Sequence, residues 1–177
     1  MATSREDRIS ILKSIAVADV SSILFITLGF FLLKHTGLFQ PVTHGKAVAF
    51  SLVIATYPLA LGLLWAASTR FFVQNLDGSD PEPGTPLDIT RRYLQNTLEQ
   101  TVLFALAAIA FFFAAPEFSA SLLPVMAVWF FIARALFWIG YRSANTLNRA
   151  IGFAASFHPS LCLLLAALVL SLLNTFN

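Results

Sequence analysis

Charged residues are scarce in this chain of 177 residues. Only 11% are Asp, Glu, Lys or Arg, whereas 58% are hydrophobic, and the mean hydropathy is +0.78. A soluble domain of this length normally carries about a quarter charged residues. The composition therefore argues against a soluble enzyme and predicts a multi-pass membrane protein. A formal net charge of +2 is too small to indicate a nucleic-acid partner.

Cysteine and histidine are also rare, which limits the chemistry to consider. Cys162 is the only cysteine, so no intrachain disulfide can form. His35, His44 and His158 stand in separate segments without cysteines or carboxylates at metal-ligand spacing, so we predict no metal site. The sequence contains neither a glycine-rich phosphate loop nor a serine, histidine and acid pattern typical of a catalytic triad.

Long apolar runs make up most of the chain. A helix of about 20 apolar residues crosses a hydrocarbon core of ~30 Å. We expect five such helices, over residues 10–33, 46–73, 86–115, 121–144 and 148–173. Thr85 and Pro86 are typical of a helix start, and Pro58 and Pro159 should bend the second and fifth helices. The predicted fold class is all-α, a multi-pass transmembrane helix bundle with a polar loop over 75–86.

The basic residues predict the orientation. With five spans, one side holds eight basic residues and the other holds two. Cytoplasmic loops carry the excess of Lys and Arg, so we expect the N-terminus in the cytoplasm and, in a bacterium, the protein in the cell inner membrane. The eight are Arg5, Arg8, Lys13, Arg70, Arg91, Arg92, Arg142 and Arg149; the two are Lys34 and Lys46.

A polar motif opens the third predicted helix. Arg92, Asn96 and Glu99 follow i, i+4, i+7 spacing and should share one helix face, ahead of an uncharged run over 101–114. Glu99 and Arg134 each lie about 10 Å from the same interface, so we expect them to pair. Buried alone, the two would together cost ~5 to 7 kcal/mol on the insertion scale. A binding or catalytic role and a purely structural ion pair both remain open.

More arginines surround this motif at the same end of the bundle. Arg70, Arg149 and Tyr141 are expected near Asn96 and Glu99, while Arg91 and Arg142 fit the role of membrane anchors. Guanidinium groups suit carboxylates, and a buried carboxylate suits an ammonium. The mixture indicates a site for a small zwitterion with more than one carboxylate.

Two further polar residues lie deep in predicted spans. Asp19 is a candidate for contact with a substrate or proton path, but we favour a partnered, or protonated, carboxyl that holds the first helix to its neighbours. We expect His158 to bond a backbone carbonyl freed by Pro159 rather than to act in acid–base chemistry.

Three spaced motifs resemble the MAPEG family, the membrane-associated proteins in eicosanoid and glutathione metabolism. They are Arg92-x-x-x-Asn96-x-x-Glu99, Arg134 with Gly140-Tyr141, and Arg149-Ala-Ile-Gly-Phe153 followed by Pro159. The resemblance covers about residues 46 to 174. It divides the chain into an extra N-terminal helix and loop, 1–44, and a four-helix membrane domain, 45–177.

The resemblance implies a homotrimer that binds glutathione between subunits near the cytoplasmic face. Arg149 would face the glutathione sulfur, with Arg142 as second candidate. The residues that would hold glutathione are Arg70, Arg92, Asn96, Glu99, Arg134 and Tyr141. Gln100 stands where the leukotriene-forming members often have tyrosine, and Phe137 stands where the family usually has tyrosine or histidine. Phe137 cannot donate a hydrogen bond to a ligand.

The expected function is a glutathione-dependent transferase or peroxidase acting on hydrophobic electrophiles or lipid hydroperoxides that arrive from the membrane. The alternative is a non-catalytic protein that binds lipid or glutathione without turnover. A small transporter or channel subunit fits less well, because the outer halves of the last three predicted spans are almost wholly apolar.

Overall fold

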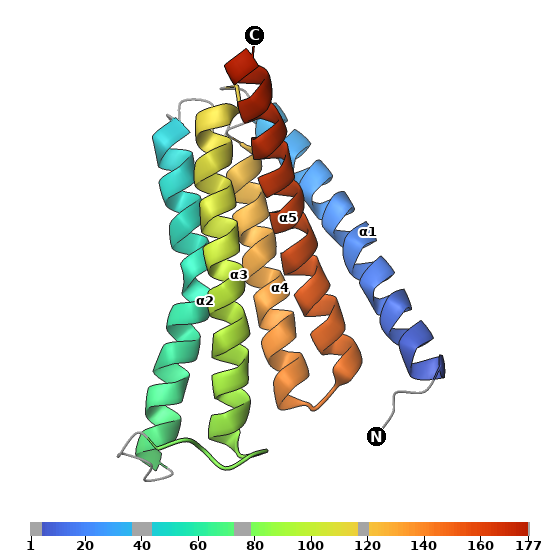
Figure 1. Ribbon diagram of the computed structural model, residues 1–177, viewed down its shortest axis with the longest axis vertical. Helices are drawn as coiled ribbons and strands as arrows, with labels where there is room; N and C mark the ends of the chain where they lie inside the picture. Colours follow the sequence, from blue (N-terminus) through green and yellow to red (C-terminus); the bar gives the residue numbers. More distant parts are fainter. Residues whose placement is uncertain (1–4, 37–43, 73–78, 117–120, 177) are drawn as a thin grey trace.

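The computed structural model describes residues 5–36, 44–72, 79–116 and 121–176. Within these residues the chain forms five α-helices and no strand (Figure 1). Their bounds are α1 Arg5–Thr36, α2 His44–Phe72, α3 Pro86–Ala114, α4 Leu122–Arg142 and α5 Thr146–Phe176. Each helix is long and apolar enough to cross a membrane. The predicted multi-pass helix bundle is confirmed; the predicted loops lie partly outside the described residues.

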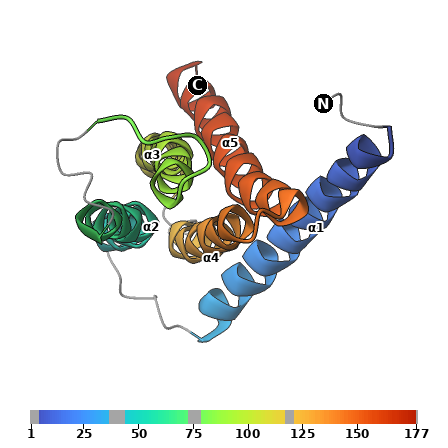
Figure 2. The ribbon, with the colours of Figure 1, turned by 90° about the horizontal axis from the view of Figure 1, so that it is seen from below.

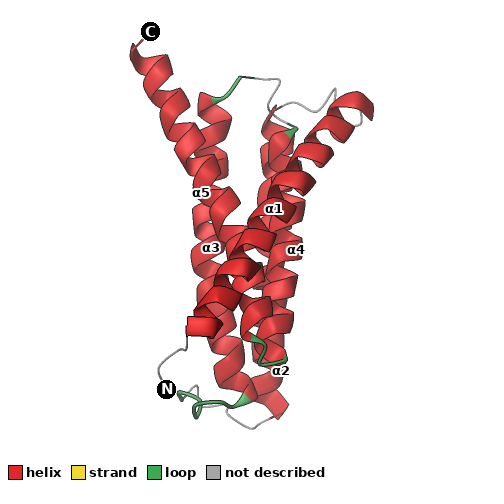
Figure 3. Ribbon diagram, turned by 90° about the vertical axis from the view of Figure 1, so that its right-hand side faces the viewer, coloured by secondary structure: helices red, strands yellow, loops and turns green. Residues whose placement is uncertain are grey.

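The helices α2 to α5 form the bundle, and α1 leans against its flank. Seen along the helices, α4 lies between α2, α3 and α5, with α1 across the outside of α4 and α5 (Figure 2). Turned to the side, α1 runs obliquely over the bundle from the lower end to the upper end (Figure 3). In the most apolar part of α1 only 11% of residues are buried, against 56% in α4. α1 is therefore a peripheral helix.

The core lies where α3, α4 and α5 meet, and Val48 and Ala55 of α2 complete it. The rings of Phe104 and Phe130 pack with centroids 5.1 Å apart, and Leu123 and Leu163 close the cluster around them. Close helix approach depends on glycine at α4 and α5, as small residues allow in membrane bundles. A Cβ added to Gly140 would stand 2.6 Å from the backbone nitrogen of Arg149. Glycine at that position thus sets how closely α5 begins against α4.

Helix ends follow local chemistry. Thr85 Oγ1 accepts from the backbone N–H of Asp88 at 3.3 Å, with Pro86 next, so the predicted start of α3 is confirmed. Asn145 Oδ1 accepts from the N–H groups of Leu147 and Asn148 at 3.0 and 3.2 Å. Because this cap lies before Thr146, α5 begins two residues earlier than predicted. Ser121 makes no side-chain cap bond, and α4 begins at Leu122.

One end of the bundle collects most of the arginines. The start of α1, the end of α2, the start of α3, the end of α4 and the start of α5 all lie at the lower end in Figure 1. We call this the basic end, because it carries Arg5, Arg70, Arg92, Arg142 and Arg149. The helix order thus gathers distant basic residues as the five-span prediction requires.

Candidate functional site

A pocket of about 410 Å³ opens near the basic end, between α1, α3, α4 and α5. We call it the Arg149 pocket. Its polar members are Asn96 from α3, Tyr141 from α4, and Thr146, Arg149 and His158 from α5. Its apolar members are Ile11, Ile15, Phe137, Ala150, Phe153 and Ala154. Three predicted site residues from three helices, Asn96, Tyr141 and Arg149, therefore line one pocket.

Arg149 is positioned by the first turn of α5. Its guanidinium carbon lies 5.1 Å from the centre of the Tyr141 ring, and Nη2 donates to Thr146 Oγ1 at 3.2 Å. The side chain is only partly buried. A guanidinium has five N–H donors, so most of its donor capacity remains available in the pocket.

Arg134 lies behind the pocket wall and is fully buried. Its nitrogens donate to Thr97 Oγ1 at 2.7 Å, Asn96 Oδ1 at 3.1 Å and Ser156 Oγ at 3.4 Å. The guanidinium carbon stands 3.9 Å from the centre of the Phe137 ring. Neutral oxygens and an aromatic face thus surround this cation, and its bond to Asn96 fixes one member of the pocket.

The predicted pair between Glu99 and Arg134 is wrong for the described part of the chain. Glu99 is exposed and accepts from Gln95 Nε2 at 2.8 Å. Arg92, Gln95 and Glu99 share the outward face of α3, whereas Thr97 faces the core and Asn96 stands at the edge. Arg134 therefore meets the threonine that follows Asn96 rather than the carboxylate three residues away.

Arg92 is held on its own helix by Asp88. Arg92 Nη2 lies 3.0 Å from Asp88 Oδ2, and Nε donates to Oδ1 at 3.2 Å. The Asp88 side chain is only 4% exposed and also accepts from the Gly84 N–H at 2.8 Å. Sequence reasoning treated Asp88 only as part of the helix start. The i, i+4 spacing from Asp88 to Arg92 was the signal that would have identified the pair.

A family model now places the chain. The model of the MAPEG family matches residues 46–169, which covers more than half of the chain. The chain belongs to the MAPEG family. It is therefore an integral membrane protein of a family in glutathione and eicosanoid metabolism. The matched segment runs from α2 to α5 and leaves α1 outside. Comparison with curated proteins and with solved structures finds no match.

Two other arginines of this MAPEG chain lie away from the Arg149 pocket. Arg142 places its guanidinium carbon 4.9 Å from the centre of the Trp65 ring on α2. Arg70 is in the last turn of α2 and does not line the pocket. Within one protomer, the structure therefore separates Arg142, the second candidate for the sulfur, from Arg149.

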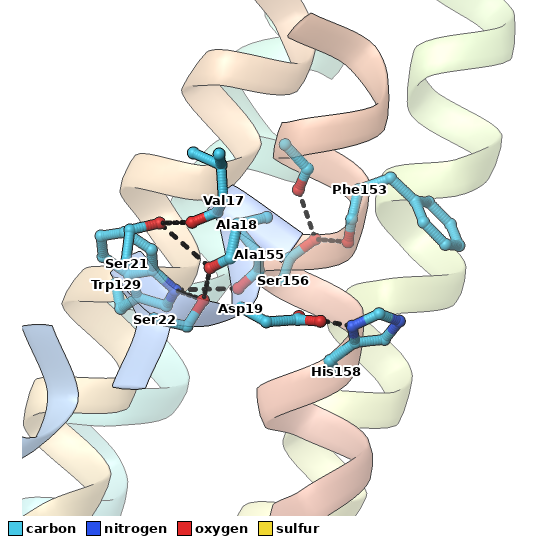
Figure 4. A network of polar contacts seen from close by, with 11 residues as sticks. Val17, Ala18, Asp19, Ser21, Ser22, Trp129, Phe153, Ala155, Ser156 and His158 are labelled. Atoms are coloured by element: carbon cyan, nitrogen blue, oxygen red, sulfur yellow. Dashed lines mark hydrogen bonds and ion pairs between the residues drawn. The ribbon is translucent and has the colours of Figure 1, made fainter. Parts of the chain in front are cut away.

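Two half-exposed ionisable groups, Asp19 and His158, join α1 to the MAPEG domain. Asp19 Oδ1 lies 2.6 Å from His158 Nδ1 (Figure 4). The partnered arrangement favoured for Asp19 is therefore present. The prediction for His158 is wrong, because Trp129 Nε1 donates to the Ala155 carbonyl at 2.9 Å. Ala155 precedes Pro159 by four residues, so its carbonyl is the one the proline leaves without a helical donor.

Proposed function

We propose that this MAPEG protein binds glutathione in the Arg149 pocket and uses it to attack or reduce a lipophilic substrate from the membrane. The observation that carries the proposal is the convergence of Asn96, Tyr141 and Arg149, which come from three helices, on one pocket. Arg134 would act as a positioning residue through its bond to Asn96.

The pocket suits the chemistry of glutathione, which has two carboxylates, an ammonium and a thiol. Arg149 offers a guanidinium fork for a carboxylate or thiolate, and Asn96 and Tyr141 offer hydrogen bonds. Its volume of about 410 Å³ lies within the range of roughly 300 to 1,000 Å³ for small-molecule pockets. Phe137 and Phe153 supply apolar walls that limit water.

We further propose a homotrimer, because the outward face of α3 needs a cover. Arg92, Gln95 and Glu99 are exposed near the basic end, and Val102, Leu106 and Ile109 continue the same exposed face. A carboxylate seven residues beyond Arg92 would be costly against lipid. A second copy of the chain on this face would bring Glu99 and Arg92 to a shared glutathione site, with the basic end on the cytoplasmic side.

Glutathione would supply the nucleophilic sulfur in either reaction. A thiol with pKa near 8.5 is mostly protonated at neutral pH, and the thiolate is the reactive form. Lowering that pKa by about two units needs ~2.7 kcal/mol of preferential stabilisation of the thiolate. One partly desolvated guanidinium can provide this, and Arg149 is the candidate.

The test is the ultraviolet absorbance band of the thiolate when glutathione is titrated into the purified protein. We expect a band in the wild type, its loss in Arg149→Ala, and its retention in Arg142→Ala, whose guanidinium packs on Trp65. An equal band in Arg149→Ala would remove Arg149 from this role.

A second candidate function is binding without turnover. It is favoured by Phe137, which occupies the pocket wall without a hydrogen-bonding group and packs on Arg134. Turnover of a generic electrophile separates the two functions. Consumption of glutathione supports the enzyme, and binding with no consumption supports the second function.

A further inference from the structure

A second cavity, of about 650 Å³, lies between α1 and the MAPEG bundle. We call it the α1 cavity. Its lining is apolar except for Asp19, Ser22, Thr27, His158 and Cys162; the apolar members are Ile23, Ile26, Phe111, Leu122, Met126, Pro159, Leu163 and Ala166. Because one wall is α1, which lies outside the matched segment, family membership assigns no role to this cavity.

Asp19 and His158 mark the boundary between the two cavities. His158 lines both the α1 cavity and the Arg149 pocket. Asp19 and His158 each stand within three residues of the middle of their helices. From this pair the α1 cavity extends to Leu122, the first residue of α4, at the upper end of the bundle. The polar pair therefore lies at the inner end of an apolar chamber, near mid-membrane depth.

The pair has hydrogen-bonding capacity left over. The Asp19 and His158 side chains are 39% and 38% exposed. Their mutual bond uses one carboxylate oxygen and one ring nitrogen, so the second oxygen and the second nitrogen remain. Polar groups exposed to hydrocarbon are costly unless bonded. A hydroxyl suits this pair, because it can donate to the second carboxylate oxygen or to an unprotonated ring nitrogen, and it can accept from that nitrogen when the nitrogen carries a hydrogen.

Neighbouring bonds hold the wall of the cavity in place. Trp129 Nε1 donates at 2.9 Å both to Ser22 Oγ on α1 and to the Ala155 carbonyl on α5. Ser22 in turn donates to the Ala18 carbonyl at 2.7 Å. Figure 4 shows this network beside the Asp19–His158 pair. The two halves of the polar pair are thus presented by helices that a third side chain ties together.

We propose that the α1 cavity binds a single-chain lipid with a hydroxyl group in the middle of its chain. The hydrocarbon tail lies in the apolar chamber, and the mid-chain oxygen bonds to Asp19 and His158. A lipid head group lies at the membrane surface, so only an oxygen within the chain reaches this depth. The site does not depend on glutathione, although it would place the oxygenated carbon beside the Arg149 pocket.

Native mass spectrometry of the detergent-solubilised protein, without glutathione, tests the site. The probes are 12-hydroxyoctadecanoic acid and octadecanoic acid, which differ only in the mid-chain hydroxyl. We expect the hydroxy acid to bind one per chain and roughly tenfold more tightly, as a hydrogen bond to a charged group allows. Equal affinity for the two acids would overturn the assignment.

Variants test the location. The double variant Asp19→Leu with His158→Leu should bind both acids equally, because it removes the polar pair. Ala166→Phe fills the chamber without touching the pair and should lose both acids. Leu165→Phe, on the exposed side of the same helix, is the matched control and should bind like the wild type. Undiminished binding in Ala166→Phe would show that the lipid binds elsewhere. Arg149→Ala should bind the hydroxy acid as tightly as the wild type, which separates this site from the glutathione pocket.

Discussion

Arg134 and Arg149 carry the same guanidinium group but differ in burial and in bonding partners. Arg134 is fully buried, donates to three neutral side-chain oxygens, and packs 3.9 Å from the centre of the Phe137 ring. Arg149 is partly buried, donates to Thr146 and leans on Tyr141. Asn96 joins the two regions, because it accepts from Arg134 and lines the Arg149 pocket.

The difference shows that depth in a membrane bundle does not by itself identify a ligand contact. A buried cation needs bonding partners to be tolerated, and Arg134 has them at Nη1 and Nη2, although its buried Nε has none among the described residues. Arg134 does not line the Arg149 pocket. Arg149 retains free donors because it lies at a helix start beside an open pocket. We therefore assign a structural role to the buried Arg134, and Arg149, which lines the pocket, is the candidate for chemistry.

Replacing Arg134 should have the largest effect on stability. Arg134→Ala would leave Asn96 and Thr97 without their donor and open a cavity beside Phe137, so we expect a loss of about 3 kcal/mol or more in the free energy of unfolding. Unfolding in mixed micelles measures it. Arg142→Ala, which removes an exposed guanidinium from Trp65, should cost less than about 1 kcal/mol. Similar losses of unfolding free energy in the two variants would contradict a structural role for the buried Arg134.

Trp129 is another buried side chain of α4, and its replacement should have the next largest effect on stability. Trp129→Phe keeps an aromatic ring but leaves the Ala155 carbonyl without its indole donor, which should cost about 1 to 3 kcal/mol. Trp138→Phe is the control, because the Trp138 indole makes ring contacts with Tyr93 and Trp65. Proteolysis of α1 should accelerate in Trp129→Phe only. Equal protection in both variants would mean that Trp129 does not hold α1.

One substitution at Asn96 should affect protein stability and glutathione affinity in different ways. Asn96→Asp would place a carboxylate beside Arg134, so we expect stability to stay equal or rise. The same charge would repel the carboxylates of glutathione, so its Kd should rise on the order of tenfold. Thermal unfolding and calorimetric titration of one preparation measure both. A fall in both stability and affinity would show that the surroundings of Arg134 and the Arg149 pocket do not act separately.

Much of the fold was predictable from the sequence. The five spans and the cap at Thr85 follow from apolar length and local hydrogen bonding, both of which act over short stretches. The convergence of Asn96, Tyr141 and Arg149 followed from the five-span topology, which places all three near one end of the bundle, and the family resemblance gave their expected roles. Side-chain faces were harder to predict. Thr97 and Glu99 are two residues apart and point to nearly opposite sides of α3, about 200° around the helix, so the rotation of α3 decides which of them meets Arg134.

Contacts between distant helices could not be read from the sequence. Trp129 takes the carbonyl expected for His158 because α4 happens to pass beside the proline of α5. His158 meets Asp19 because α1 crosses α5 at the middle of both helices. Such pairings depend on crossing geometry, which periodicity within a single helix does not contain.

The most direct test of the central claim is the affinity of glutathione for Arg149→Ala, measured by calorimetry with the unfolding temperature of the same sample. If Arg149 binds glutathione and does not support the fold, the variant should show a Kd raised roughly tenfold or more, as loss of a charge-assisted bond implies. Its unfolding temperature should be unchanged. A wild-type Kd in this variant would contradict the account.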